Sequence, residues 1–324
     1  MPLHQKLRPL SLLFMFALLA GGVSPASDAR ASRSEGRASH ADDFGVMLMA
    51  HGGAAEWNQA VLDAVASFEN DFPVEVAFGM ADAVSIQEAV HRLQARGVRK
   101  IGVVRLFVSG ESWYERTRQI LGLSEGAPVR PAGMDGHDHG SAHGEMVHRM
   151  EFWRVETHAS FAMSKEGLAE AREMGPVLAD RARTLSREAE AEDVLILAHG
   201  PGADAENQMW LAKIDTRADA VRDALPFPRV QVETLREDWP EKREVAEKRI
   251  RSFVKNASDE GGTAIVIPFR VQGFGPYADV LEGLDYVSDG LGLLPHANVE
   301  IWIKRQAEEL ASGSFEAPVS GGQK

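Results

Sequence analysis

Two stretches with the same beginning decide the fold: VMLMAHGGAAEWNQ at residues 46–59 and VLILAHGPGADAENQMW at residues 194–210. Each is an unbroken apolar run that ends in Ala-His-Gly and leads into a polar segment. A short apolar run closed by glycine is typical of a buried strand in a parallel sheet. The two histidines, His51 and His199, lie 148 positions apart. The repetition predicts two similar units in one chain.

The segments after each stretch alternate between helical and strand patterns in the same order. In the first half these are a helix near 58–68, the strand VEVAF (74–78), a helix at 85–95 that begins at Ser85 as its N-cap, and the strand KIGVVRLFVS (100–109). In the second half they are a helix at 209–224, the strand VQVETL (230–235), a helix at 241–256 and the strand TAIVIPFRV (263–271). This alternation predicts an α/β fold, with two doubly wound parallel-sheet lobes related by internal duplication.

The same reading gives boundaries for the parts of the chain. A last strand of the first lobe is expected within 152–163, and VEIWI at 299–303 is expected to be a strand that closes the second. The predicted parts are a signal peptide and cleavage region (1–31), a loose tail (32–42), an N-terminal lobe (43–163) with a His-rich loop (134–150), a connecting helix (164–192), a C-terminal lobe (193–310) and a flexible tail (311–324).

The N-terminus has the pattern of an export signal. A positive start containing Lys6 and Arg8 precedes the apolar run LSLLFMFALLA at 10–20, and small-residue cleavage sites follow at 24–26 and 29–31. The apolar run is too short to span a bilayer comfortably, which favours a cleaved secretory signal over an uncleaved anchor. The sequence therefore predicts an exported, periplasmic protein with no membrane span after cleavage.

Composition excludes several functional classes. The chain has 324 residues, a net charge of −13 and no cysteine. An acidic protein of this kind is not suited to coating nucleic acid or an anionic membrane. Without cysteine, any metal must be bound by His, Asp or Glu. No Gly-rich phosphate loop, dinucleotide fingerprint or nucleophile elbow occurs, so no nucleotide cofactor is expected. Whether the chain forms a homo-oligomer is left open.

The strand-end histidines are the first candidate site. Ligands of doubly wound sheets bind outside the carboxyl ends of the strands, where His51 and His199 are expected. A neutral imidazole binds divalent metals such as Co²⁺, Fe²⁺, Ni²⁺ or Zn²⁺. A structural role, with each ring hydrogen-bonded to a neighbouring loop, is the alternative.

The end of the third strand, VVRLFVSGESWYERTR, supplies a second set of candidates at the same sheet edge as His51. Glu111 and Glu115 can ligate a metal or take protons, Arg105 and Arg116 can grip carboxylates, and Trp113 can stack on a flat ring. A solvated helix start is the alternative. The matching end in the second half, VIPFRVQGFGPYADV, carries Arg270 in place of the acidic set.

A His-rich stretch, MDGHDHGSAHGEMVHRM at 134–150, is a separate signal. Its spacing matches no fixed zinc motif, so it indicates either loose metal capture or a plain solvated loop. The candidate ligands here are His137, His139, His143 and His148, with His158 from the following strand as a further one.

Taken in order, LMAHGG, VEVAF and ARGVRKIGVVRLFVSG resemble the sirohydrochlorin cobaltochelatase and ferrochelatase family, and the likeness covers most of 44–305. The resemblance implies a bilobal fold with a tetrapyrrole in the cleft and insertion of Co²⁺ or Fe²⁺ without ATP. It also implies that the strand-end histidine, here His51 or His199, is a metal ligand and acid/base group.

The sequence departs from that family at the second histidine, which follows the third strand. Ser112 stands at its place in the first half, next to Glu111, and Gly275 stands there in the second. Two replacements are open: Glu111 or Glu115 as ligand or base, or a histidine from 137–158.

The chemistry of metallation assigns roles to the remaining candidates. His51 would hold the metal and, with Glu111, take protons. Arg105, Arg116 and Arg270 would bind substrate carboxylates, and Trp57, Trp113 or Trp210 would form a flat wall. The expected function is a chelatase, and the alternative is a non-catalytic exported protein that binds metal or tetrapyrrole.

Overall fold

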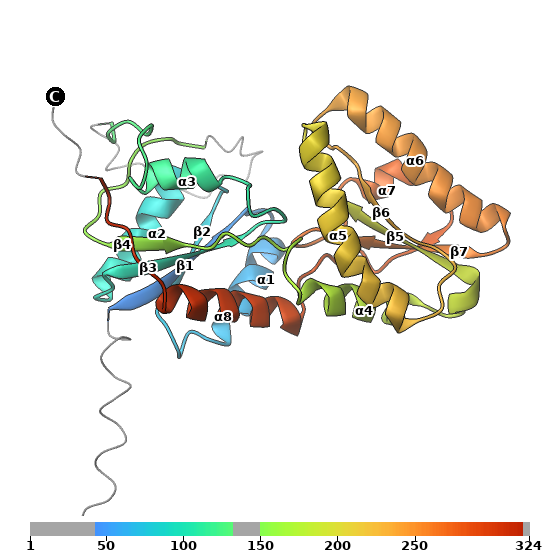
Figure 1. The fold of residues 1–324 in the computed structure, drawn as a ribbon, viewed down its shortest axis with the longest axis horizontal. Coiled ribbons are helices and arrows are strands. Elements are labelled where there is room, and N and C mark those ends of the chain that lie inside the picture. The colour runs from blue at the N-terminus through green and yellow to red at the C-terminus, as the bar shows by residue number, and fades with distance from the viewer. Residues whose placement is uncertain (1–42, 132–149, 320–324) are drawn as a thin grey trace, which may run out of the picture. The chain divides into compact units, whose positions relative to one another are not determined.

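The computed structural model describes residues 43–131 and 150–319, which form two four-stranded parallel sheets with helices against them (Figure 1). The first sheet has the order β2-β1-β3-β4, with β1 Phe44–Ala50, β2 Val74–Phe78, β3 Lys100–Leu106 and β4 Ser160–Met163. The second has the order β6-β5-β7-β8, with β5 Glu192–Ala198, β6 Val230–Thr234, β7 Thr263–Pro268 and β8 Tyr286–Val287. The predicted fold class is confirmed. Below, the N-terminal lobe is the first sheet with its helices, and the C-terminal lobe is the second.

The two sheets also agree in register. Val46 of β1 pairs with Val74 of β2 and Gly102 of β3. Val194, 148 positions later, pairs with Val230 of β6 and Ile265 of β7. The matched registers place His51 and His199 at equivalent points, one residue beyond the carboxyl end of a central strand.

The central strands are buried on both faces, as an all-parallel sheet requires. Every residue of β1 and of β5 is buried. Side chains alternate between faces: Leu48 and Ile196 belong to one large apolar cluster, whereas Met47 and Leu195 belong to separate clusters on the opposite faces. The large cluster contains residues of both sheets, so the lobes share one continuous core.

The helices differ from expectation at the start of α4 and at the N-cap of α2. They are α1 Ala55–Ala66, α2 Ala83–Ala95, α3 Tyr114–Ile120, α4 Met174–Leu185, α5 Asp204–Ala224, α6 Pro240–Asp259, α7 Tyr277–Val280 and α8 Ala297–Ala311, with a 3₁₀ turn at Ala189–Ala191. The expected helix from 165 is wrong, because α4 begins only at Met174. The N-cap of α2 is Asp82, whose carboxylate accepts from the Ser85 amide at 2.9 Å, rather than Ser85 itself.

The predicted strand at 299–303 is also wrong. This segment lies in α8, where Val299, Trp302, Ile303, Gln306 and Ala307 are buried. Their spacing is helical, with three- and four-residue steps, although VEIWI alone reads as a short strand. The His296 ring caps the helix by accepting from the Asn298 amide at 3.1 Å.

Each lobe lends its last helix to the other. The helix α4, which follows β4 of the N-terminal lobe, packs on α5 and β7 of the C-terminal lobe. The helix α8, which follows β8 of the C-terminal lobe, packs on β3 and α1 of the N-terminal lobe and lies along that sheet in Figure 1. The boundary predicted at residue 310 therefore assigns α8 by chain order rather than by packing.

The two connections that make this exchange are built alike. The Leu168 amide donates to the Phe107 carbonyl at 3.0 Å, and the Leu293 amide donates to the Arg270 carbonyl at 2.8 Å. Both contacts need glycine just before, because a Cβ on Gly167 would lie 2.3 Å from the Gly110 nitrogen and one on Gly292 would lie 2.6 Å from the Arg270 oxygen.

An ion-pair network fastens α8 to the segment before α4. Arg305 binds the carboxylate of Glu173 through Nε at 2.7 Å and that of Glu166 through Nη2 at 2.6 Å. The Trp302 indole donates to the same Glu166 at 2.7 Å. Burial alone would raise the pKa of Glu173, but hydrogen bonds from Arg305 outweigh it and hold that pKa below its usual value.

Several predictions fall on residues the structure does not describe. They are the signal peptide (1–31), the loose tail (32–42), and nearly all of the His-rich loop (134–150). Across residues 43–131 and 150–319, no helix is long and apolar enough to cross a membrane.

Candidate functional site

Both strand-end histidines line one cleft of about 820 Å³, at the carboxyl ends of the two sheets. That is the sheet edge where doubly wound folds bind ligands. The cleft residues come from both lobes: His51, Trp57, Met80, Leu106, Phe107, Val108, Ser112, Trp113, His199, Gly200, Pro201, Gly202, Glu206, Trp210, Glu237, Asp238, Trp239, Arg270, Val271 and Gln272.

The two imidazoles are held in the same way. Nδ1 of His51 lies 2.7 Å from the Gly52 carbonyl, and Nδ1 of His199 lies 2.8 Å from the Gly200 carbonyl. A carbonyl can only accept, so each Nδ1 carries the proton and donates. In the neutral ring Nε2 then keeps its lone pair, which is the state needed to bind a metal or take a proton.

The surroundings of the two rings differ sharply. Nε2 of His199 lies 3.1 Å from Oδ2 of Asp238 and 3.9 Å from Oε2 of Glu237. Within the described part of the chain, no carboxylate lies within ion-pair distance of His51. Nε2 of His199 therefore faces two carboxylates, whereas Nε2 of His51 faces none among the described residues.

Arg270 completes the C-terminal side of the cleft. Its guanidinium forms an ion pair with Glu237 and lies 5.6 Å from the centre of the Tyr277 ring. Burial raises the pKa of Tyr277, so its hydroxyl stays neutral. Arg270 therefore orients the carboxylate that faces His199.

Four of the six tryptophans of the chain line the cleft: Trp57, Trp113, Trp210 and Trp239. The His51 and Trp57 rings meet edge to face at 6.3 Å, and the His199 and Trp239 rings do so at 6.1 Å. Such a lining suits a large flat ligand, because aromatic faces supply apolar area with defined geometry.

Backbone strain gathers at the same place. In the described residues, positive φ outside glycine occurs at Met80 (62°), Trp113 (59°) and Arg236 (59°). Met80 and Trp113 line the cleft, and the Arg236 side chain donates to the carbonyls of Pro201 and Gly202 in its wall. Non-glycine residues in this region of φ cluster at functional sites.

Arg105 does not reach the cleft, which corrects its predicted role. The side chain is 1% exposed. Its nitrogens donate to the carbonyls of Ser164 at 3.0 Å, Ser112 at 2.8 Å and Gly110 at 2.5 Å. Burial lowers the pKa of Arg105 to about 10, so it stays charged at neutral pH. It shapes the loop that carries Ser112 and Trp113, and its burial keeps it from reaching a substrate carboxylate.

The acidic candidates of the N-terminal lobe also lie off the cleft. Glu111 is exposed and outside the lining. Glu115 is exposed on α3 and accepts from the Ser124 hydroxyl at 2.6 Å. Arg116 donates to backbone carbonyls, including Ala81 at 2.9 Å, and stacks on Phe152 at 4.5 Å. The helix α3 begins at Tyr114, directly after the strained Trp113, so its first turn leaves the sheet edge.

The metal role predicted for His158 is wrong for this cleft. β4 begins at Ser160, whose register partner is Lys100 at the start of β3. His158 therefore lies at the amino edge of the sheet, opposite His51. The candidates His137, His139, His143 and His148 lie outside the described residues. Among the described side chains, no three of His, Asp and Glu come together as a preformed metal site.

Sequence reasoning missed Glu237, Asp238 and Trp239. It compared the ends of the third strands, where the second half has no acid. These residues follow β6, which is the neighbour of β5 in the sheet. The acidic pair after VQVETLR was visible in the sequence, and the carboxyl ends of adjacent parallel strands share one edge.

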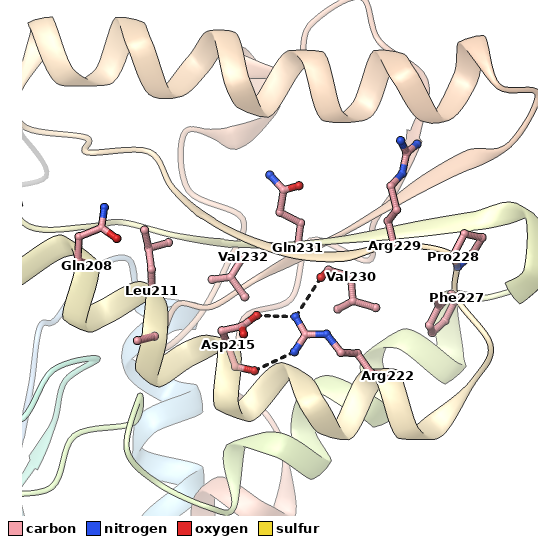
Figure 2. Close-up of a pocket in the computed structure, with 11 residues that line it drawn as sticks. Gln208, Leu211, Asp215, Arg222, Phe227, Pro228, Arg229, Val230, Gln231 and Val232 are labelled. Carbon is pink, nitrogen blue, oxygen red and sulfur yellow. Dashed lines mark hydrogen bonds and ion pairs between the residues drawn. The ribbon is translucent and has the colours of Figure 1, made fainter.

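A second hollow, of about 830 Å³, lies between α5 and the β6 edge of the C-terminal lobe (Figure 2). Its charged groups are engaged: Arg222 pairs with Asp215 and donates to the Val230 carbonyl at 3.0 Å, and Arg229 pairs with Asp193 at 2.5 Å. None of the predicted site residues lines it, so the cleft remains the candidate site.

No protein-family model matches the chain. It is 36% identical to a sirohydrochlorin cobaltochelatase of Methanothermobacter thermautotrophicus over 88 residues, which are 26% of this chain and 62% of that protein. The match therefore spans less than two thirds of the curated relative.

Solved structures share the fold at low identity. The sirohydrochlorin chelatase SirB of Bacillus subtilis with Fe³⁺ superposes at a TM-score of 0.57 and 13% identity, covering 83% of this chain and 96% of that one. SirB of subspecies spizizenii in complex with cobalt gives 0.53 and 11%, covering 83% and 95%. A multi-domain protein of Deinococcus radiodurans with similarity to chelatases gives 0.51 and 19%, covering 85% and 57%. The likeness to chelatases predicted from the sequence is confirmed at the level of the fold, because the chain shares its two-lobed α/β architecture with solved sirohydrochlorin chelatases.

Proposed function

We propose that the protein binds a tetrapyrrole in the cleft and inserts a divalent metal, Co²⁺ or Fe²⁺, without ATP. The observation that carries this is the pair of imidazoles on one cleft, each fixed through Nδ1 at about the same distance, 2.7 and 2.8 Å. Fixing Nδ1 leaves Nε2 available, and Nε2 can hold a metal ion or take a pyrrole proton.

The two sides of the cleft would divide the work. Metallation removes two pyrrole N–H protons and needs a metal ion bound weakly enough to be released. On the C-terminal side, His199, Glu237 and Asp238 offer one nitrogen and carboxylate oxygens, a donor set suited to Co²⁺ or Fe²⁺. The incomplete grouping of these donors favours transfer over permanent storage.

His51 would serve as the base on the N-terminal side. It is exposed and lacks a carboxylate partner, so a proton accepted from the macrocycle can pass to water. Ser112, at the position of the family's second histidine, also lines the cleft and can hold a water beside it. The tryptophans would hold the ring, and Arg270 would keep Glu237 turned toward His199.

A non-catalytic tetrapyrrole or metal carrier is the second candidate. The specific observation that favours it is the loss of both second histidines, replaced by Ser112 and Gly275. Export, predicted from residues 1–31, would suit either function and is itself part of the proposal.

An absorbance time course separates the two. Mature protein and Co²⁺ are mixed with sirohydrochlorin in one experiment and with a metal-free porphyrin in a second, each beside a protein-free control. Faster metallation than in the control supports a chelatase. A shifted spectrum with an unchanged rate supports a carrier. No shift and no acceleration with either macrocycle would contradict both.

A further inference from the structure

We infer that the tetrapyrrole of this cleft carries few carboxylates, in contrast to the polycarboxylate sirohydrochlorin. The inference rests on the proposed tetrapyrrole site and narrows its substrate class. It comes from the charged side chains that line the cleft and from the partners those side chains already have.

The cleft lining is acidic. Glu206, Glu237 and Asp238 line it, and Arg270 is the single Arg or Lys side chain in that lining within the described part of the chain. Arg270 is already paired with Glu237. Within the described residues, a ligand carboxylate that enters here meets the carboxylates of Glu206 and Asp238, and the only arginine or lysine of the lining is already paired.

Basic groups near the cleft wall are committed to the protein itself. Arg236 donates to the carbonyls of Pro201 and Gly202 and pairs with Asp204 at 2.9 Å. Lys242 binds the same Asp204 at 2.6 Å. Recruiting either one for a ligand would break the loop that forms the wall.

The rest of the lining is apolar and aromatic, including Leu106, Phe107, Val108 and the four tryptophans. Moving an ionised carboxylate from water to such a surface is unfavourable unless a cation meets it. The position equivalent to Arg270 in the other lobe is Phe107, since both carbonyls accept from the crossing segment. The cleft therefore attracts the flat, uncharged face of a macrocycle and repels a ring of acidic side chains.

The test is a tryptophan-fluorescence titration with three metal-free porphyrins that share one macrocycle: a dicarboxylate, a tetracarboxylate and an octacarboxylate. We expect affinity to fall along this series, by about tenfold or more from first to last at low salt, and the gap to narrow as salt screens the repulsion. Equal or tighter binding of the octacarboxylate would overturn the inference while leaving the tetrapyrrole site standing.

Substitutions in the cleft provide a second test, in which the affinity of one porphyrin is compared between wild type and variant. Differences among the porphyrins other than charge then do not affect the result. Asp238→Asn and Glu206→Gln should each tighten octacarboxylate binding several-fold and change dicarboxylate binding little. Asp223→Asn, an exposed acid on α5 away from the cleft, is the matched control and should change neither. An unchanged octacarboxylate affinity in both cleft variants would count against the inference. Failure of every porphyrin to bind would overturn the tetrapyrrole site itself.

Discussion

The segments that follow β2 and β6 have the same backbone and different chemistry. Each ends in a carboxylate four residues beyond its strand, Asp82 in one lobe and Asp238 in the other. Asp82 accepts hydrogen bonds from the amides of Ser85 at 2.9 Å and Glu151 at 2.8 Å, so both of its carboxylate oxygens already have partners. Asp238 faces His199 with 69% of its side chain exposed.

The start of the following helix explains the difference. The N-cap of α6 is Trp239, whereas the N-cap of α2 is Asp82, so Asp238 stands one residue before the capping position and is free for other partners. One residue earlier, Ala81 is fully buried where the other lobe has Glu237. Two lobes of like topology thus have, among the described residues, an imidazole without a carboxylate partner on one side and an imidazole with two carboxylates on the other.

The largest expected effect is on the rate of metallation, and it tests the difference between the two histidines. His199→Ala should lower the rate of metallation by about 100-fold or more, because it removes the nitrogen ligand of the proposed metal site, a loss at least as costly as that of a partner beyond the ligands. His51→Ala should cost about tenfold, since solvent can replace an exposed base. Stopped-flow absorbance with excess metal measures both, with circular dichroism as the check on folding. A reversed order would place the metal on the N-terminal side.

The next effect concerns the joint between the lobes. Arg305→Met should lower the free energy of unfolding by about 3 kcal/mol near neutral pH, because it removes the nearest cation of buried Glu173 and leaves only the longer contact, 3.5 Å, with exposed Arg172. The pKa of Glu173 is held below its usual value, so its stabilising contribution is present above the ordinary carboxyl pKa and is lost as the pH falls through the folded-state pKa. Urea melts at several pH values should show that the difference between wild type and variant shrinks in acid.

The paired aspartates offer a smaller and more selective contrast. Asp238→Asn should weaken Co²⁺ binding about tenfold by calorimetry and leave stability nearly unchanged. Asp82→Ala should do the opposite, costing about 1 kcal/mol of stability through the lost N-cap and leaving metal binding intact. Equal effects of the two substitutions on metal binding would show that the lobes are chemically alike after all.

The smallest expected effect is on porphyrin binding, and it should be equal for the two lobes. Trp57→Leu and Trp239→Leu each remove one edge-to-face partner of a histidine and one aromatic wall. Each should weaken porphyrin binding by about three- to tenfold, as expected for the loss of one aromatic contact. A much larger loss in one variant would show that the macrocycle lies against a single lobe.

Much of the fold was predictable because its signals are local. The apolar runs that became β1, β3, β5 and β7 were predicted correctly, and so was the position of His51 and His199, each at the carboxyl end of its strand. The segment at 299–303 was misread because five residues cannot distinguish a strand from a buried helical face. The packing of α4 and of α8 on the opposite lobe depends on contacts between distant parts of the chain, so no local sequence pattern indicates it.

The site was less predictable for a related reason. Arg105 was predicted to bind a ligand because the sequence shows its charge but does not show that it is buried. Glu237 and Asp238 were overlooked because they follow a second strand, and only the sheet order brings that strand beside β5. Burial and strand order are properties of the assembled sheets, so residue types alone could not rank these candidates.

The exchange of final helices has a consequence for anyone who dissects the chain. A fragment that ends after α4, at residue 185, would contain this helix without the surface that it covers, and would lack α8, which packs on the first sheet. Two autonomous halves would instead need circular permutation, with residues 297–311 joined to the first fragment and residues 174–185 moved into the second. Each lobe is therefore completed by a helix that the order of the chain assigns to the other lobe.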